Sequence, residues 1–117
     1  MTARPEARSY PGRMYVVLLH HTVPAEDINL ILPDHFEWIN RHYRAGDFLI
    51  EGRCAPGADS VIIAAGMKRG RLDAILATDP FVLRHMVKPE VIEFRALHTV
   101  PELVHYADRL DSGVSGG

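Results

Sequence analysis

The sequence predicts a ferredoxin-like α+β domain, in which two helices cover one face of a four-stranded antiparallel sheet. The chain has 117 residues, a length that suits one domain with a single core. Its expected elements follow the order strand, helix, strand, strand, helix, strand, which is the split βαβ arrangement. A short turn with Pro and Gly separates the second strand from the third, so these two are expected to form a hairpin.

The first strand is expected over residues 14–20, a continuous β-branched and aliphatic run that is too short for a typical helix. Residues 24–32 are expected to form a short helical turn, because Pro24 suits a first helical position. We expect Pro33 to interrupt this turn, since a proline inside a helix lacks an N–H donor.

The main helix is expected over residues 34–45. Asp34 and Glu37 have the spacing of a capping box, with Asp in the place of the usual Ser or Thr. Gly46 stands where a left-handed C-terminal cap is favoured. The apolar residues at helical spacing, which we expect to form the buried stripe, are Phe36, Ile39 and Tyr43.

The remaining elements follow from apolar runs and turn residues. We expect strands over 48–54 and 60–67, a helix over 69–78, a short helix from Asp79 to Met86, and a strand over 90–97.

The chain is expected to hold a flexible leader over 1–13, a ferredoxin-like domain over 14–97 and a C-terminal extension over 98–117. Within the extension, we expect a helix over 101–110 that is free to reach a neighbouring subunit, and a disordered end from 112. The first and third strands are apolar at nearly every position, so the sheet face without helices should also be apolar. Such a face on a small domain predicts a homodimer that packs sheet on sheet.

Composition and charge argue against several classes of function and partner. The net charge is −2 and the isoelectric point is about 6.4, which argues against a nucleic-acid partner bound on a broad basic face. A single cysteine, Cys54, cannot form an internal disulfide. No apolar run is long enough to span a membrane, and the N-terminus lacks the apolar region of a secretory signal. We therefore expect a cytoplasmic protein with no membrane partner.

Among the seven histidines, His35 is the strongest candidate for chemistry. It would lie in the first turn of the main helix, beside the apolar stripe, where the helix dipole favours the neutral imidazole that a general base needs. An exposed first-turn residue is the alternative. His20 and His21 end the first strand, and one of them could face the cleft between sheet and helices. His35 and His42 lie seven residues apart, but no zinc-binding pattern is present and we expect no metal site.

Asp79 is the second candidate. An Asp can orient an imidazole and stabilise its protonated form, but Asp before Pro80 is also a preferred helix N-cap. Both roles are compatible if the cap leaves one carboxylate oxygen free. Arg53, at the end of the second strand, could bind an anionic group at the mouth of a cleft.

Three aromatic residues complete the candidate substrate-binding set: Tyr15, Trp38 and Phe81. Core packing is the commoner role for residues such as Tyr15.

Several of these segments together resemble the YCII-related (YciI-like) family. They are residues 32–39 (LPDHFEWI), Gly46, residues 51–53 (EGR), residues 60–63 (SVII) and residues 79–81 (DPF). The resemblance covers about residues 14–97. It implies a dimeric α+β barrel with a pocket between sheet and helices, and an active-site His–Asp pair at His35 and Asp79. Lys68 stands where many members have an acidic cap, and the leader and the extension are unusual for the family.

Two functions remain open. The first is a small cofactor-independent enzyme in which His35 is the general acid or base and Asp79 orients it. Its reaction would be an elimination such as dehydrochlorination, or an isomerisation, on a small cyclic or aromatic metabolite. The second is a non-catalytic dimer that binds or senses a small ligand, in which the His–Asp pair is structural.

Overall fold

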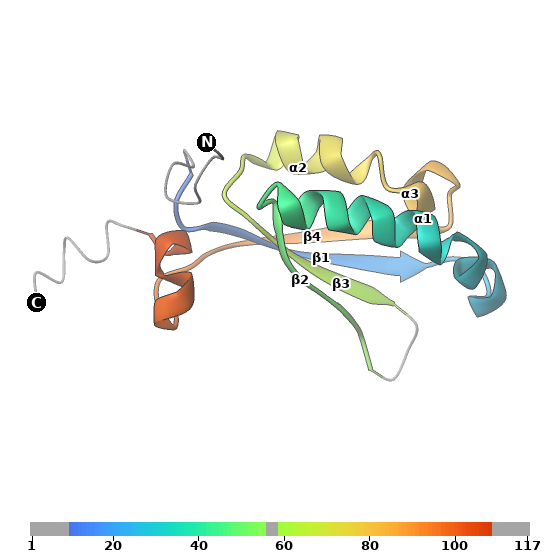
Figure 1. Ribbon diagram of the computed structural model, residues 1–117, viewed down its shortest axis with the longest axis horizontal. Helices are drawn as coiled ribbons and strands as arrows, with labels where there is room; N and C mark the ends of the chain where they lie inside the picture. Colours follow the sequence, from blue (N-terminus) through green and yellow to red (C-terminus); the bar gives the residue numbers. More distant parts are fainter. Residues whose placement is uncertain (1–9, 56–58, 109–117) are drawn as a thin grey trace, which may run out of the picture.

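In the computed structural model, which describes residues 10–55 and 59–108, one antiparallel sheet carries the α-helices on one face (Figure 1). Its strands are β1 (Arg13–His21), β2 (Phe48–Arg53), β3 (Ser60–Ala65) and β4 (Val87–Arg95), in the spatial order β2-β3-β1-β4. The predicted fold class is confirmed, and so is the β2–β3 pairing. Of the leader expected over 1–13, residues 1–9 lie outside the described residues, as do Pro56–Gly57 of the expected turn and the expected disordered end over 112–117. Arg13, expected in the leader, is the first residue of β1.

Helix α1 (Ala25–Arg44) is one continuous helix, so the predicted break at Pro33 is wrong. Pro33 cannot donate to the carbonyl of Asn29, four residues earlier. Both residues are exposed, so a water molecule can donate the missing hydrogen bond to the carbonyl of Asn29, and the helix continues. The capping box at Asp34 is wrong for the same reason, because Pro24 is the N-cap and Asp34 lies inside the helix.

The longer helix also changes which residues are buried. The buried residues of α1 are Ile28, His35, Trp38 and Ile39. Phe36 and Tyr43, which were predicted in the stripe, are 47% and 37% exposed. His35 therefore lies within the buried stripe, since positions 28, 35 and 39 fall on the same side of one continuous helix.

The C-terminal half has shorter helices and a longer last strand than predicted. Helix α2 spans Arg69–Leu76, and α3 (Pro80–Leu83) is a single turn. His85 then adopts a φ of +58°, which turns the chain into β4. β4 starts at Val87 because it pairs with β1 along all nine residues of that strand.

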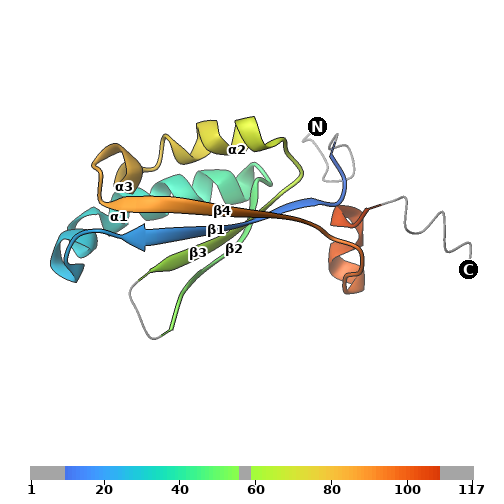
Figure 2. The same cartoon turned by 180° about the vertical axis from the view of Figure 1, so that it is seen from behind.

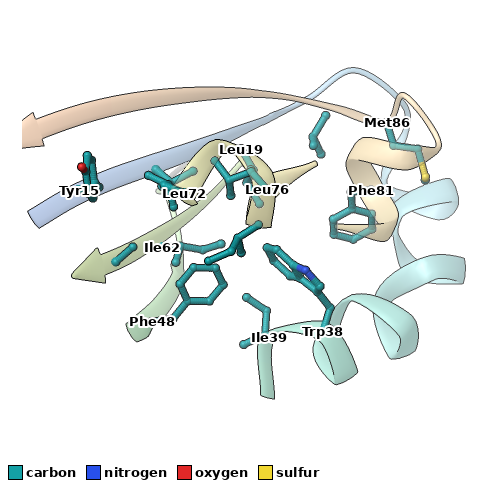
Figure 3. Close-up of a cluster of buried hydrophobic side chains, with 14 of the residues drawn as sticks. Tyr15, Leu19, Trp38, Ile39, Phe48, Ile62, Leu72, Leu76, Phe81 and Met86 are labelled. Atoms are coloured by element: carbon teal, nitrogen blue, oxygen red, sulfur yellow. The ribbon is translucent and has the colours of Figure 1, made fainter. Parts of the chain in front are cut away.

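The core fills the space between the helices and the sheet (Figure 3). Trp38 from α1 and Phe81 from α3 lie at one end of this core, and Tyr15 from β1 lies at the other. All three side chains are almost fully buried. This packing fixes the position of α3 relative to α1, which positions the site described below.

The predicted helix over 101–110 is a 3₁₀ helix, η2 (Pro101–Tyr106), at the end of the sheet beside the start of β1 (Figure 2). The backbone N–H of Gly12 donates to the carbonyl of Tyr106 at 2.8 Å, and that of Asp108 donates to Ala96 at 2.8 Å. The described part of the extension thus folds back on its own sheet and is not free, contrary to the prediction. Gly12 permits this approach, since a Cβ there would lie 2.9 Å from the Cα of Asp108.

No helix among residues 10–55 and 59–108 has the length and apolar character needed to cross a bilayer.

The continuity of α1 predicts the effect of two substitutions. Pro33→Ala should raise the free energy of unfolding by about 1–3 kcal/mol, because Ala restores the missing N–H donor inside the helix. Asp34→Ala should change it by less than about 0.5 kcal/mol, because an exposed residue inside a helix caps nothing. Urea denaturation measures both. A loss of more than about 1 kcal/mol in Asp34→Ala would show that the helix starts there instead.

Candidate acid–base site

His35 forms hydrogen bonds with two carboxylates at once. Its Nδ1 lies 2.8 Å from Oδ1 of Asp79, and its Nε2 lies 2.7 Å from Oε2 of Glu51. The side chains of His35 and Asp79 are 1% and 0% exposed, and that of Glu51 is 16% exposed. Residues from α1, β2 and the start of α3 therefore meet in one buried network.

Asp79 is held by the turn that it caps. Its Oδ1 accepts the backbone N–H of Phe81 at 3.0 Å as well as the bond from His35. The predicted N-cap is thus confirmed, and the same oxygen serves both partners. The second oxygen, Oδ2, is buried and has no hydrogen-bond partner among the described residues.

Sequence reasoning missed Glu51 as a site residue, because a β-bulge in β2 changes the face of the sheet to which its side chain points. Strict alternation from the buried Phe48 would place Glu51 on the opposite face of the sheet. The register shifts between Phe48 and Ile50, so that Glu51 pairs with the helix-facing Ile62. Both Phe48 and Glu51 can then face the helices, and the carboxylate reaches His35.

The two carboxylates determine the charge of His35. Burial alone would lower its pKa, but the hydrogen bonds and charges of Asp79 and Glu51 outweigh burial and raise the pKa to about 9. His35 is therefore an imidazolium at neutral pH. The predicted neutral imidazole is wrong, because His35 lies in the middle of α1 and the positive end of the helix dipole is too far away to act on it.

Aromatic rings hold the imidazole in place. The ring of Phe81 stacks on His35 with a centroid separation of 4.3 Å and an interplanar angle of 23°. The indole of Trp38 lies at 5.6 Å from the same ring, and its Nε1 donates to Oγ1 of Thr78 at 2.9 Å. With both nitrogens bonded and one face covered, the imidazole has little freedom to turn.

A cavity of about 160 Å³ opens beside this network. Its lining combines apolar and polar side chains: His21, Ile28, Leu32, His35, Phe36, Glu51, Gly52, Arg53, Ser60 and Phe81. A cavity of roughly 150 Å³ binds benzene in another protein, so the volume suits one small ring. The cavity brings His35 and Glu51 to the same surface as Arg53.

The structure separates two of the predicted binding residues from this cavity. Tyr15 is buried in the core, and its hydroxyl donates to the carbonyl of Met67 at 2.9 Å. Trp38 packs behind His35 and does not line the cavity. Phe81 and Arg53, the other two residues of the predicted substrate-binding set, line the cavity.

Another histidine, His42, belongs to a different network. His42 bonds to the buried Asp47 at 2.9 Å, and Arg71 bonds to the same carboxylate. Across residues 10–55 and 59–108, no group of three His, Cys, Asp or Glu side chains has a metal-binding arrangement. His35 and His42 thus serve two separate carboxylate networks.

Comparisons with known proteins find several solved structures that are similar to this chain, two of which are described here. No family model matches the chain, and no curated protein matches it by sequence. One structure is TftG, a 5-chloro-2-hydroxyhydroquinone dehydrochlorinase from Burkholderia phenoliruptrix AC1100, in complex with 2,5-dihydroxybenzoquinone. Its TM-score is 0.60 at 10% identity, over 71% of this chain and 94% of that chain. The other is a mutant of SnoaB, a cofactor-independent oxygenase from Streptomyces nogalater, with a TM-score of 0.45 and 16% identity over 76% of this chain and 96% of that chain. The likeness to TftG shows a shared fold.

The raised pKa of His35 predicts how stability depends on pH. The folded state binds the proton more tightly than the unfolded state, whose ordinary value is 6.5. The stabilisation is therefore complete below pH 6.5 and is lost as the pH rises to about 9. We expect the wild-type free energy of unfolding to fall by roughly 3 kcal/mol over that interval.

Urea denaturation at a series of pH values measures this loss. His35→Gln should remove most of the decline between pH 6.5 and 9, because the titrating group is absent. An equally steep decline in His35→Gln would show that other groups cause it.

Proposed function

We propose that this chain is a small enzyme that uses no cofactor and moves protons to and from a small ring substrate. The observation that supports this most is the placement of a charged His35 and of Glu51 at the surface of a ring-sized cavity, with the buried Asp79 behind them. A proton donor, His35, and a proton acceptor, Glu51, lie side by side there, as acid–base catalysis needs.

The roles follow from the contacts. The imidazolium of His35 has a proton to donate, and the Glu51 carboxylate beside it can accept one. Asp79 does not line the cavity, so it is a positioning residue that holds Nδ1 of His35 and balances its charge. Of the two roles that the sequence left open for His35, general acid or general base, the charged imidazole takes the role of the acid.

The reaction class is an isomerisation or an elimination. Glu51 removes a proton from a ring hydroxyl, and His35 delivers a proton to a ring carbon, which converts the enol to its keto form. If the protonated carbon also carries chloride, Glu51 first passes its proton to Nε2 of His35 and then takes the proton of a second ring hydroxyl, para to the new carbonyl. The electrons of that O–H bond form the second carbonyl, a ring double bond shifts, and chloride leaves with the electron pair of its bond, so that HCl is lost as chloride and the proton on Glu51.

The resemblance to YCII-related proteins supports this reading, and so does the fold shared with TftG, a dehydrochlorinase. We propose on these grounds that the chain belongs to the same group of small enzymes. The substrate class is a small cyclic or aromatic metabolite, because the cavity is small and Phe36 and Phe81 form part of its wall.

A binding or sensing role is the second candidate. One observation favours it: both nitrogens of His35 are already bonded to protein carboxylates, as in a purely structural network. Such a protein would bind a ring compound without exchanging its protons, which separates the two candidates.

We also propose that the active form is a homodimer. On the sheet face opposite the helices, three β-strand side chains are strongly exposed for their type: Ile50, Ile92 and Phe94 are 57%, 47% and 42% exposed. Val16 and Ile63 lie among them, because Val16 pairs with both Ile63 and Ile92. A second copy offers the same apolar surface, so the two faces can cover each other around a twofold axis.

The catalytic proposal predicts a loss of proton exchange in His35→Gln. The probe is 1,2,4-trihydroxybenzene without oxygen, and the measurement is the exchange of its ring hydrogens in D₂O by NMR. We expect the rate to fall by about 10²- to 10⁴-fold, because the acid is lost. The wild-type rate should decline above about pH 9, where His35 loses its proton.

Asp79→Asn provides the matched control. Removal of this negative charge lowers the pKa of His35, so the decline in rate should begin at a lower pH than in the wild type. An unchanged rate of exchange in His35→Gln would reject the catalytic proposal and favour the binding or sensing role.

The dimer proposal predicts that Ile92→Lys gives a monomer, because a charge at the centre of an apolar interface is costly to bury. Sedimentation velocity measures the mass in solution. Leu30→Lys, at an exposed position on α1, should remain a dimer. A wild-type mass of one chain would reject this assembly.

A further inference from the structure

A second hydrogen bond joins helix α1 to the chain beside Asp79. Nε1 of Trp38 donates to Oγ1 of Thr78 at 2.9 Å. Its neighbour is the 2.8 Å bond between His35 and Asp79. His35 and Trp38 are three residues apart, so they lie on the same side of α1, about one turn apart. The corner between α2 and α3, residues 77–79, is therefore attached to α1 at two adjacent points.

We propose that the bond between Trp38 and Thr78 is a positioning contact, which sets the place of the Asp79 carboxylate relative to the imidazole of His35. One hydrogen bond alone lets its two partners turn about it, whereas a second bond close by removes that freedom. Trp38 and Thr78 thus act through Asp79. The inference deepens the proposed function, and it gives Trp38 a role behind the imidazole in place of the predicted contact with substrate.

The indole is the fixed side of this contact. Trp38 is fully buried, and the rings of Phe48 and His42 pack edge-on against it at 5.3 Å and 5.2 Å (Figure 3). His42 is itself held, because its Nδ1 bonds to the buried Asp47 at 2.9 Å. The indole therefore has little room to follow a movement of Thr78, and its N–H marks one position for the hydroxyl.

The hydroxyl of Thr78 passes this position on to the backbone. Its single proton goes to the carbonyl of Ile75 at 2.6 Å, so a lone pair of the same oxygen receives the N–H of Trp38. The backbone N–H of Thr78 donates to the same carbonyl at 3.0 Å. The side chain is thus bound to the end of α2 and to α1 at once, immediately before the residue that bonds to His35.

Asp79 needs this support because its own bonds gather on one oxygen. Oδ1 serves both His35 and the backbone N–H of Phe81. Oδ2 is buried and has no hydrogen-bond partner within the described ranges of the chain. A carboxylate that is held through one oxygen can turn about it, so its orientation depends on the backbone that carries it. Thr78 is the neighbouring residue of that backbone.

Thr78→Val tests the contact, because it replaces the hydroxyl by a methyl group of similar shape. Thr78 is exposed, so the fold should tolerate the change. The buried indole N–H then faces a methyl group, which is costly, and the corner moves away from it. The measurement is the titration of His35 by NMR, without substrate. Its midpoint should fall by about one pH unit from the wild-type value of about 9, because a weaker bond to Asp79 stabilises the imidazolium less.

Two matched variants serve as controls. Thr78→Ser keeps the hydroxyl and should restore the wild-type midpoint. Thr99→Val makes the same change at another exposed threonine, whose hydroxyl bonds to the carbonyl of Val100 in the extension. It should leave the titration of His35 unchanged.

Trp38→Phe approaches the same bond from its other end. It removes the indole N–H but leaves the bond between Thr78 and Ile75 in place. If both residues act through their shared bond, the double variant Trp38→Phe/Thr78→Val should shift the midpoint no further than the larger of the two single shifts. A merely structural role would lower the urea midpoint of unfolding without moving the titration of His35.

The proposal is overturned if Thr78→Val keeps the wild-type titration of His35, or if the two single shifts add in the double variant. The titration needs no substrate, whereas proton exchange in His35→Gln reports on the chemistry. Either proposal can therefore fail while the other stands.

Discussion

The two hydrogen bonds from the buried imidazolium of His35 to the carboxylates of Asp79 and Glu51 are the constraint on which the rest of the site depends. Burying His35 as a cation is costly unless its charge is balanced and both N–H groups are bonded. Asp79 and Glu51 meet both needs at 2.8 Å and 2.7 Å. Because these three residues come from α1, α3 and β2, the network also joins the helical layer to the edge of the sheet.

The segment from Asp79 to Phe81 shows how one short turn can serve stability and chemistry together. Asp79 caps α3 through the backbone of Phe81, and the same oxygen holds His35. The ring of Phe81 stacks on the imidazole and continues into the wall of the cavity. A change at either residue would therefore disturb the helix start, the orientation of His35 and the shape of the cavity at once.

Strand β1 divides its side chains between two surfaces. Tyr15, Val17 and Leu19 are fully buried beneath the helices. His20 and His21 are neighbours in sequence, yet His20 bonds to Asp59 and Glu90 while His21 lines the cavity. The alternation of a strand is the physical reason, and it gives two adjacent histidines opposite surroundings: carboxylates raise the pKa of His20, and burial lowers that of His21.

The sequence by itself determined the element order, the fold class, the cap at Asp79 and the left-handed Gly46, because these depend on periodicity and on residues a few positions apart. It also offered His35 and Asp79 as candidate site residues, from their residue types and positions and from the resemblance given above. Only the tertiary structure decided that α1 continues through Pro33, since exposure of Asn29 and Pro33 to water depends on which face is buried. It alone brought Glu51 to His35, because a bulge changes the face of the strand without leaving a pattern in the residues. The charge of His35 followed from that contact, since a pKa is set by neighbours in space.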